Sequence, residues 1–509
     1  MPSYLSPGVY VEEVSSGSKP IEGVGTAVAA FVGFAEKGPL DEPVLVTNWT
    51  QFVETFGQFT EGALLAHSVY GYFLNGGGTA YVVRVGGGPG QRSGEPVEPA
   101  ARGTELPSNG SGKPLVVRAI EGAAGGPLTV EVQEASEPAD ETFKLVVRSG
   151  EDEEVFDNIT TRRGPANVVT ALRKSRWIAA EEVKGGALAV PETGSRTTVP
   201  RNEPVRRTAG AAEYIGDAEE RTGFSGLEAV DDITMLCVPD LMTAYQAGTL
   251  DLDGVKAVQS AMIAHCELMS DRVAILDPPP GLRPQQIKDW RLNVAGYDSK
   301  YAALYWPWVK VSDPRSGKPL MMPPSGHVAG VWARNDDTRG VHKAPANEVI
   351  RGVLDLQSSL TRGEHDQLNP IGVNCLRFFP GQGIRIWGAR TLSSDPEWRY
   401  LNVRRLFNYL EKSILGGTNW VVFEPNDPFL WSSVERIIGM FLRRVWRTGA
   451  LFGRTPEEAF YVKCDAENNT PESRDAGILT VDIGVAPVKP AEFVVFRLAQ
   501  FAEGTELQE

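Results

Sequence analysis

Two kinds of apolar spacing alternate along the second half of the chain. Short, continuous apolar runs are typical of buried strands, and between them apolar residues recur every three or four positions, as on one face of a helix. Strands separated by helices in this way predict a parallel sheet with helices on both faces. The predicted strands are residues 233–239, 271–280 and 299–311, and the predicted helices are residues 255–268, 326–336 and 347–353.

Two longer amphipathic helices are expected nearer the C-terminus. The first covers residues 398–415 and should end at Gly416 and Gly417. Asp427 caps the second, with Pro428 at its first position. The segment between them, residues 419–425, is predicted to be a strand. The two apolar faces consist of Val403, Leu406, Phe407, Leu410 and Ile414, and of Leu430, Val434, Ile437, Phe441 and Val445.

Both ends of the chain carry apolar, β-branched runs that no neighbouring element completes. Residues 6–14 are followed by a flexible Ser-Ser-Gly-Ser-Lys-Pro stretch, and residues 491–501 are followed by a polar tail. An unpaired apolar strand offers a free row of backbone donors and acceptors to the sheet edge of another chain. Residues 478–486 alternate strictly between apolar and polar, which predicts a half-buried strand.

Changes in composition divide the chain into segments. Strand-like runs and a helix near residues 67–74 form a first globular segment, residues 25–90. Residues 91–212 are rich in Gly, Pro, Ser, Glu and Arg with short alternating runs, which predicts a small β-rich domain inserted at the surface. The other expected segments are an N-terminal arm and linker at 1–24, an α/β domain at 213–365, a C-terminal domain at 366–489 and a C-terminal arm at 490–509.

Composition excludes several classes of protein. The chain has 509 residues and a net charge of −15, which favours solubility and disfavours nucleic acid as a partner. It contains neither a long apolar stretch for direct membrane insertion nor a signal peptide, so we expect synthesis in the cytoplasm. The cysteines lack the spacing of a zinc or redox site and are predicted to be buried thiols. They are Cys237, Cys266, Cys375 and Cys464.

Four motifs in order resemble the contractile tail sheath family, which includes phage tail sheaths, R-type bacteriocin sheaths and the sheaths of phage-like extracellular injection systems. The similarity extends over nearly the whole chain except the inserted segment. The motifs are SPGVYVEEV at 6–14, FLNGGGTAYVVRV at 73–85, RFFPGQGIRIWGARTL at 377–392 and GVAPVKPAEFVVFRLAQ at 484–500.

The resemblance implies a structural subunit with no catalytic site, cofactor or metal. The expected fold is multidomain α/β (α+β), with a subtilisin-like α/β core, a C-terminal α/β sheath domain, the inserted β-rich domain and two strand arms. Copies of the chain would form hexameric rings around an inner tube, with baseplate and cap or terminator proteins at the ends. The sheath would assemble in the cytoplasm in a metastable extended state, and its contraction would drive the tube through a target envelope.

The resemblance also assigns roles to residues. Residues 4–14 would be the N-terminal strand and 15–24 its linker, residues 491–501 the C-terminal strand, and residues 478–486 part of the receiving sheet. The arm residues are Val9, Tyr10, Val11 and Val14, with Phe493, Val494, Val495, Phe496 and Leu498. The receiving residues are Leu479, Val481, Ile483 and Val485.

One group of basic residues stands out in an acidic chain. Five arginines fall on the polar faces of the two long helices and either form a solvated face that pairs with Glu411 and Glu435, or face an acidic tube. Contacts of the second kind would be individually weak and sensitive to salt. The arginines are Arg404, Arg405, Arg443, Arg444 and Arg447.

Other chemistry fits the sequence less well. Asp277, His265 and Ser325 supply the residue types of a hydrolase triad, but His265 lies in an apolar helical pattern and Ser325 lacks a nucleophile-elbow context. The glycines at 76–78 and in 380–388 are predicted to be tight turns, because no phosphate-binding helix follows them. Several histidines and acids are better explained as a polar loop than as a metal site. These are His327, His342 and His365 with Asp336, Asp337, Glu364 and Asp366.

Two alternatives to a contractile sheath subunit stay open at this point. One is a serine hydrolase that uses the expected subtilisin-like core, and the other is a static filament or shell protein that assembles by the same strand exchange. The sequence is equally compatible with a phage tail, a bacteriocin and an injection system.

Overall fold

The computed structural model describes residues 20–86, 104–109, 113–119, 128–139, 141–149, 152–162, 164, 166–175, 177–180, 188–199 and 209–496. The chain divides into two compact units. One comprises Met1–Gly87 together with Thr208–Glu509, and the other is Gly88–Arg207. The smaller unit coincides closely with the β-rich insertion expected from composition.

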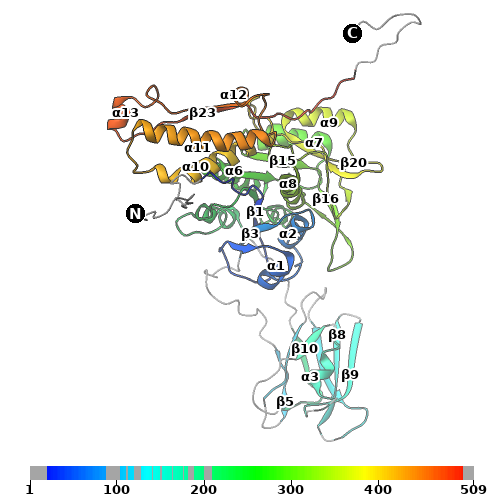
Figure 1. The fold of residues 1–509 in the computed structure, drawn as a ribbon. Helices are drawn as coiled ribbons and strands as arrows, with labels where there is room; N and C mark the ends of the chain where they lie inside the picture. The colour runs from blue at the N-terminus through cyan, green and yellow to red at the C-terminus, as the bar shows by residue number, and fades with distance from the viewer. Residues whose placement is uncertain are drawn as a thin grey trace, which may run out of the picture. The chain divides into compact units, whose positions relative to one another are not determined.

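A nine-stranded sheet forms the centre of the larger unit (Figure 1). Six neighbouring strands are parallel, as predicted, and the strands at the two edges are antiparallel. In spatial order the strands are β18 (Glu348–Val349), β21 (Gly383–Ile386), β20 (Val373–Phe379), β15 (Ala302–Trp306), β14 (Val273–Leu276), β13 (Met235–Cys237), β1 (Val28–Gly33), β3 (Thr79–Arg84) and β2 (Val44–Val46).

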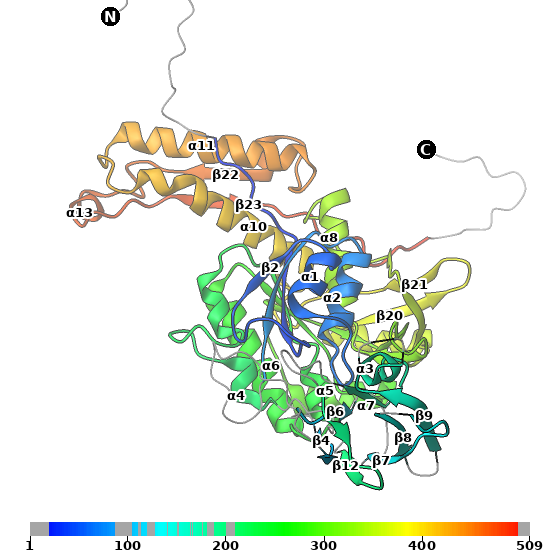
Figure 2. The same ribbon diagram turned by 90° about the horizontal axis from the view of Figure 1, so that it is seen from below.

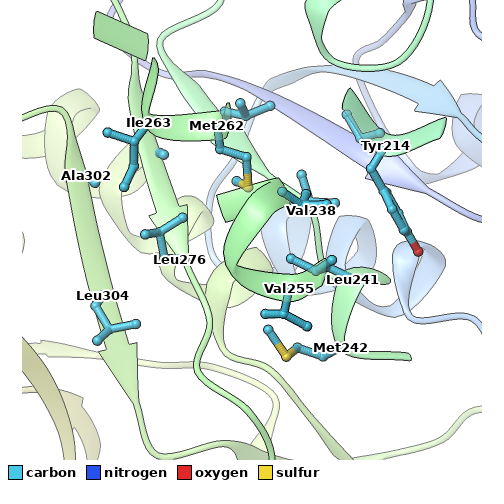
Figure 3. Close-up of a cluster of buried hydrophobic side chains, with 14 of the residues drawn as sticks. Tyr214, Val238, Leu241, Met242, Val255, Met262, Ile263, Leu276, Ala302 and Leu304 are labelled. Atoms are coloured by element: carbon cyan, nitrogen blue, oxygen red, sulfur yellow. The ribbon is translucent and has the colours of Figure 1, made fainter. Parts of the chain in front are cut away.

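Helices cover both faces of this sheet because its central strands are apolar on both sides. In β1, Ala30 and Val32 belong to one apolar cluster and Ala29 and Phe31 to the other. Figure 3 shows part of the first cluster, to which Val255, Met262 and Leu276 contribute side chains. The first face carries α4 (Ala211–Ile215), α5 (Leu241–Gln246), α6 (Leu252–Met269) and α7 (Pro284–Asp289), and the second carries α1 (Trp49–Phe56), α2 (Leu65–Leu74) and α8 (Ser325–Arg339).

Two predictions for this region were wrong in detail. Residues 299–311 are not one strand, because Pro307 separates β15 from β16 (Val309–Ser312), which pairs with β17 (Pro319–Met322) and β19 (Val353–Leu356). Residues 347–353 are not a helix. Their backbone bonds to β21 instead: the amide of Ile350 donates to the carbonyl of Ile384 at 2.9 Å.

The two long C-terminal helices are α10 (Leu401–Thr418) and α11 (Pro428–Arg447) (Figures 1 and 2). Asp427 accepts a hydrogen bond from the amide of Leu430 at 2.8 Å, and Pro428 opens the helix, as predicted. The helices bury one apolar cluster together with β22 (Phe460–Lys463) and part of the segment around β23 (Asp482–Val485). The short helices of this layer are α12 (Pro456–Ala459) and α13 (Pro471–Asp475).

Three sequence expectations for this layer are corrected. Helix α10 continues through Gly416 and Gly417 and ends at Thr418. Residues 419–425 are a 3-10 turn, η4 (Asn419–Val421), and a bend, because no neighbouring strand offers them a ladder. The C-terminal domain does not begin at residue 366, since β20 pairs with β15 and β21 pairs with β20 inside the main sheet.

The smaller unit is built from short antiparallel strands around its own apolar cluster. Its main sheet has the order β12 (Arg196–Val199), β7 (Leu128–Glu134), β8 (Thr142–Ser149) and β9 (Asp152–Thr160). The remaining elements are β4 (Thr104–Glu105), β5 (Ser108–Asn109), β6 (Val116–Ala119), α3 (Val168–Leu172), β10 (Ile178–Ala180) and β11 (Val190–Pro191).

The remaining short elements connect the parts of the larger unit. They are η1 (Ser225–Ala229), the π-helical turn η2 (Trp290–Ala295), α9 (Arg362–Leu368) and η3 (Asn369–Ile371).

Candidate functional site

Residues 20–26, here called the N-terminal anchor, run across helices α10 and α11 before entering β1. Ile21 is 1% exposed and belongs to the apolar cluster of the two helices. Gly417 makes this possible, because a Cβ there would lie 2.5 Å from the Ile21 side chain. The amide of Val24 donates to Ser413 Oγ at 3.1 Å, and Arg444 donates to the carbonyl of Ile21. The second half of the predicted linker is therefore a packed segment.

A buried ion pair continues this anchor into the sheet. Arg405 donates to both carboxylate oxygens of Asp336, at 2.9 and 2.5 Å, and both side chains are 3% exposed. Thr26 Oγ1 donates to the same carboxylate at 2.7 Å, and Arg405 donates to the carbonyl of Thr26 at 3.0 Å. Because the pair joins α10 to α8, it ties the anchor to both the helical layer and the α/β core.

Residues 486–492, here called the C-terminal anchor, return from β23 to the edge of the core. Val488 bonds to the backbone of Ala450 and accepts from the amide of Asn402 at 3.0 Å. The guanidinium of Arg390 then donates two hydrogen bonds to the carboxylate of Glu492, at 2.9 and 2.6 Å. Asn369 and Tyr400 also donate to it, at 2.7 and 3.2 Å.

The charge of Glu492 is stabilised by these donors. Burial by itself would raise its pKa, but the hydrogen bonds from Arg390 and Asn369 outweigh burial and hold the pKa below the ordinary value of 4.5. The carboxylate is therefore ionised at neutral pH and marks the last fixed point of the chain before the C-terminal arm.

Immediately after Glu492 the chain becomes an exposed apolar segment. Phe493, Val494, Val495 and Phe496 are 74%, 68%, 76% and 85% exposed, and they belong to no strand. The other predicted arm residues, Val9, Tyr10, Val11, Val14 and Leu498, lie outside the described residues. Four exposed apolar residues in succession constitute an unpartnered surface of a kind that marks interaction sites.

The predicted receiving strand is shorter than its pattern. Residues 478–486 were expected to form it, but β23 covers only Asp482–Val485 and pairs with β22 in a two-stranded sheet. Leu479, Val481 and Val485 pack against the helix cluster, whereas Ile483 is 37% exposed. Within the described chain, β22 and β23 each have one unpaired edge.

The five arginines do not form one surface. Arg404 is 1% exposed: it donates to Asn408 and Glu411 at 2.7 and 3.0 Å, and its guanidinium lies 4.5 Å from the Trp398 ring centre. Arg405 is buried in the pair described above. The prediction was wrong for these two because both face the α/β core. Arg443, Arg444 and Arg447 are exposed on α11.

The residues of the hypothetical triad are divided between two places. The amide of Ser325 donates to Asp277 Oδ1 at 3.1 Å, where β14 meets the start of α8. His265 instead lies 3.2 Å from Arg272 Nη1 and against the Phe224 ring. Burial, reinforced by Arg272, lowers the pKa of His265 to about 4, and burial raises the pKa of Asp277 to about 7.

A second aspartate, Asp240, lies at the carboxyl ends of β1 and β13. Its carboxylate accepts hydrogen bonds from the backbone amides of Phe34, Leu64 and Leu65 at 2.7, 2.5 and 3.2 Å, and so pairs with the free amides at the start of α2. Burial raises its pKa to about 6 against these hydrogen bonds. Open α/β sheets commonly bind ligands at such a point. In this protein the side chains of Asp240 and Asp277 bond to the N-termini of α2 and α8, where a ligand would otherwise bind.

The remaining candidates have structural roles. Gly76 and Gly381 adopt positive φ in turns, as predicted, and Gly383 does so where β21 begins. The four cysteines are buried free thiols, as predicted. The histidines and acids do not form a polar loop: His327 is buried in α8, and Asp336 in the same helix binds Arg405. Across the described ranges, no three His, Cys, Asp or Glu side chains are grouped to hold a metal, and no helix is long and apolar enough to cross a membrane.

The residues that hold the two anchors were not predicted from the sequence. Ile21 follows Pro20 in a short polar stretch and Glu492 lies two positions after Pro490, so neither belongs to a periodic pattern. A signal was present for Ile21, since it is the one large apolar residue between Val14 and Val24. Nothing local indicated that Glu492 would meet Arg390, which lies 102 positions earlier.

Most of the larger unit matches two models of known protein families. Residues 227–392 match the phage tail sheath protein central domain, and residues 393–501 match the phage tail sheath C-terminal domain. The boundary between them agrees with the assignment of β20 and β21 to the core sheet.

Individual relatives point the same way. The tail sheath protein of Burkholderia phage BcepMu is 24% identical over 96% of this chain and 95% of its own length. The tail sheath protein of Vibrio phage KVP40 is 26% identical over 71% of this chain, and the match spans 56% of that relative. Among solved structures, the helical sheath of the anti-feeding prophage in its contracted state is similar with a TM-score of 0.60 and 25% identity, over 97% of this chain and 99% of that one.

Proposed function

This chain belongs to the phage tail sheath family and is a structural sheath subunit, and we propose that its terminal arms join it to copies of itself by strand exchange. In this proposal the arms of neighbouring subunits add to the free edges of β22 and β23. A contact of this kind joins different surfaces of two copies, and it generates a helical array when its rotation does not close. The observation that carries the proposal is the exposed apolar segment at Phe493–Phe496, which starts from a fixed point at Glu492.

The contraction itself follows from a two-state array. Subunits whose cores are rigid and whose arms are shared can rotate and repack without separating. We propose that the extended sheath is a kinetically trapped state that relaxes to a more compact one, so that contraction needs no fuel. The two anchors support rigid-body motion, because they bind the helical layer to the α/β core within each subunit.

The proposed partners are an inner tube, baseplate proteins and a cap or terminator protein, with subunits arranged in hexameric rings. Arg443, Arg444 and Arg447 are the exposed members of the predicted basic group, and in this proposal they face an acidic tube. We propose neither catalysis, nor a cofactor, nor nucleic acid binding, and we expect synthesis and assembly in the cytoplasm. The particle would be a phage tail or a phage-like contractile particle.

The arm proposal is tested by changing the linker. Three extra residues inserted between residues 15 and 19 should permit sheath assembly but weaken the link between rings and block contraction. Electron microscopy distinguishes long narrow from short wide sheaths and provides the readout. The same insertion in the exposed turn at residues 247–249 is the control. Normal contraction of the linker variant would refute the arm assignment, and particles with only one form would favour a static filament.

The basic surface is tested by charge reversal. Arg443→Glu with Arg447→Glu should impair assembly around the tube and leave the subunit folded, because both side chains are exposed. Lys256→Glu with Lys318→Glu, also exposed, is the matched control. Normal assembly of the arginine variant would show that this surface does not bind the tube. A serine-directed probe that labelled Ser325 would instead support the hydrolase alternative.

A further inference from the structure

One end of the C-terminal helix pair carries an exposed apolar surface, here called the tip. It lies where α10 ends, α11 begins and α13 follows, and both views place these elements at the same end of the layer (Figures 1 and 2). The amide of Asn426 binds the carbonyl of Ile478 at 3.1 Å and joins the two parts. The tip consists of Leu415, Val422, Phe423, Phe429 and Ile478, which are 69%, 63%, 102%, 83% and 54% exposed.

Phe423 is the most unusual residue of the tip. Its φ of 69° lies in the left-handed region, which bulky side chains seldom adopt, and its side chain is fully exposed. A strained backbone that presents an uncovered aromatic ring has no compensation among the described residues. Strain of this kind and exposed apolar surface both indicate a contact made with another segment.

The N-terminal anchor leads toward the tip. Val24 contacts Ser413, and Ile21, nearer the N-terminus, contacts Gly417. The chain before Ile21 therefore starts from the last turns of α10. Leu415 of the tip is two positions from Gly417. Residues 10–20 can extend about 35 Å from Ile21, so Tyr10 reaches any part of the tip.

The C-terminal arm is less suited to the same place. It starts from Glu492, which is bound by Tyr400 at the other end of α10, about 27 Å away along a helix of 18 residues. Residues 497–509 carry three glutamates and Arg497, whereas the N-terminal arm carries Glu12 and Glu13 after an uncharged stretch at residues 1–11. Glu424, Glu472 and Asp475 are exposed beside the tip and would repel glutamates of either arm, so the uncharged stretch is the part suited to cover it.

We propose that in the free subunit the N-terminal arm folds back and covers the tip of its own chain. The apolar residues of the arm, Tyr4, Leu5, Val9, Tyr10 and Val11, then shield the tip until assembly withdraws the arm to a neighbour. The contact is an internal one that is exchanged for a contact between subunits, as in domain swapping. It concerns the unassembled subunit, and it is testable whether or not strand exchange links the sheath.

Disulfide crosslinking tests the contact. The full chain with Tyr10→Cys and Phe423→Cys is purified unassembled, as a mixture of isotopically labelled and unlabelled protein, and oxidised. The native cysteines do not compete because they are buried. We expect the disulfide to form within single chains, so that the two linked cysteines always carry the same isotope label. We expect no disulfide in the control with Leu498→Cys and Phe423→Cys. Mixed-label disulfides, a disulfide in the control, or no disulfide at all would each overturn the proposal.

Dye binding provides a second measurement. Deletion of residues 1–19 should increase the fluorescence of an apolar dye, and Phe423→Ser with Phe429→Ser should abolish that increase. Leu268→Ser, which removes a side chain 69% exposed on α6, should not abolish it. Equal fluorescence of the full and shortened chains would contradict the shielding. Failure of sheath assembly in the full chain would contradict the proposed function and leave this result standing.

Discussion

The N-terminal anchor is held by apolar burial and a buried ion pair, whereas the C-terminal anchor is held by charge-assisted hydrogen bonds at its last residue. Ile21 is enclosed by α10 and α11, and the segment continues directly into the central strand β1. Glu492 is 18% exposed and depends on Arg390, Asn369 and Tyr400. The first anchor should therefore withstand changes of salt and pH better than the second, because solvent screens partly exposed charges.

The two anchors also define the fixed part of the larger unit. Thr26 and Ile21 fix its N-terminal side, and Glu492 fixes its C-terminal side. Under the proposed strand exchange, the helical layer and the α/β core of this unit would move together, because both anchors join them.

The largest effect should come from the ion pair of the N-terminal anchor. Arg405→Met leaves the buried Asp336 carboxylate without its partner and should lower the free energy of unfolding by about 3–5 kcal/mol. Chemical denaturation measures it. Arg405→Met with Asp336→Leu should recover much of the loss. If the double variant were no more stable than the single one, the stabilisation would not come from the charge pair.

A smaller effect is expected from the apolar part of the same anchor. Ile21→Ala removes a side chain that is 1% exposed and should lower the free energy of opening of residues 20–26 by about 2–4 kcal/mol. Native-state hydrogen exchange reports this opening. Glu22→Ala, at an exposed neighbouring position, should change it by less than about 0.5 kcal/mol. Similar protection in the two variants would mean that Ile21 does not hold the segment.

The smallest effect should come from the C-terminal anchor. Glu492→Gln keeps the shape but removes the charge, and should cost about 1–2 kcal/mol in the opening of residues 486–492, less at high salt. Hydrogen exchange at neutral pH, with and without added salt, measures the loss.

The same residue gives the C-terminal anchor a pH dependence. The folded pKa of Glu492 lies below its unfolded value of 4.5, so its contribution is present above pH 4.5 and is lost as the pH falls through the folded pKa. In Glu492→Gln, the opening of residues 486–492 should not become easier in this pH range. If it did so to the same extent as in the unchanged protein, another group would be responsible for the pH dependence.

Local features of the fold were predictable because they depend on neighbours in sequence. Asp427 and Pro428 start α11 through a hydrogen bond to Leu430, three positions away, and the apolar stripes of α6, α10 and α11 follow from helical spacing. The insertion was recognised from composition, and family membership from four ordered motifs. Each of these signals lies within a short window of residues.

Only the tertiary structure decided which distant residues meet. Arg404 and Arg405 have the spacing of a solvated helix face, yet α10 lies against the core and both are buried. Arg405 bonds to Thr26 across 379 positions, and Glu492 to Arg390 across 102. The alternation at 478–486 predicted a full strand, but only the four residues opposite β22 found a partner. Periodicity determines that a face is apolar or polar, whereas packing determines what covers it, because that choice depends on elements brought together by the whole fold.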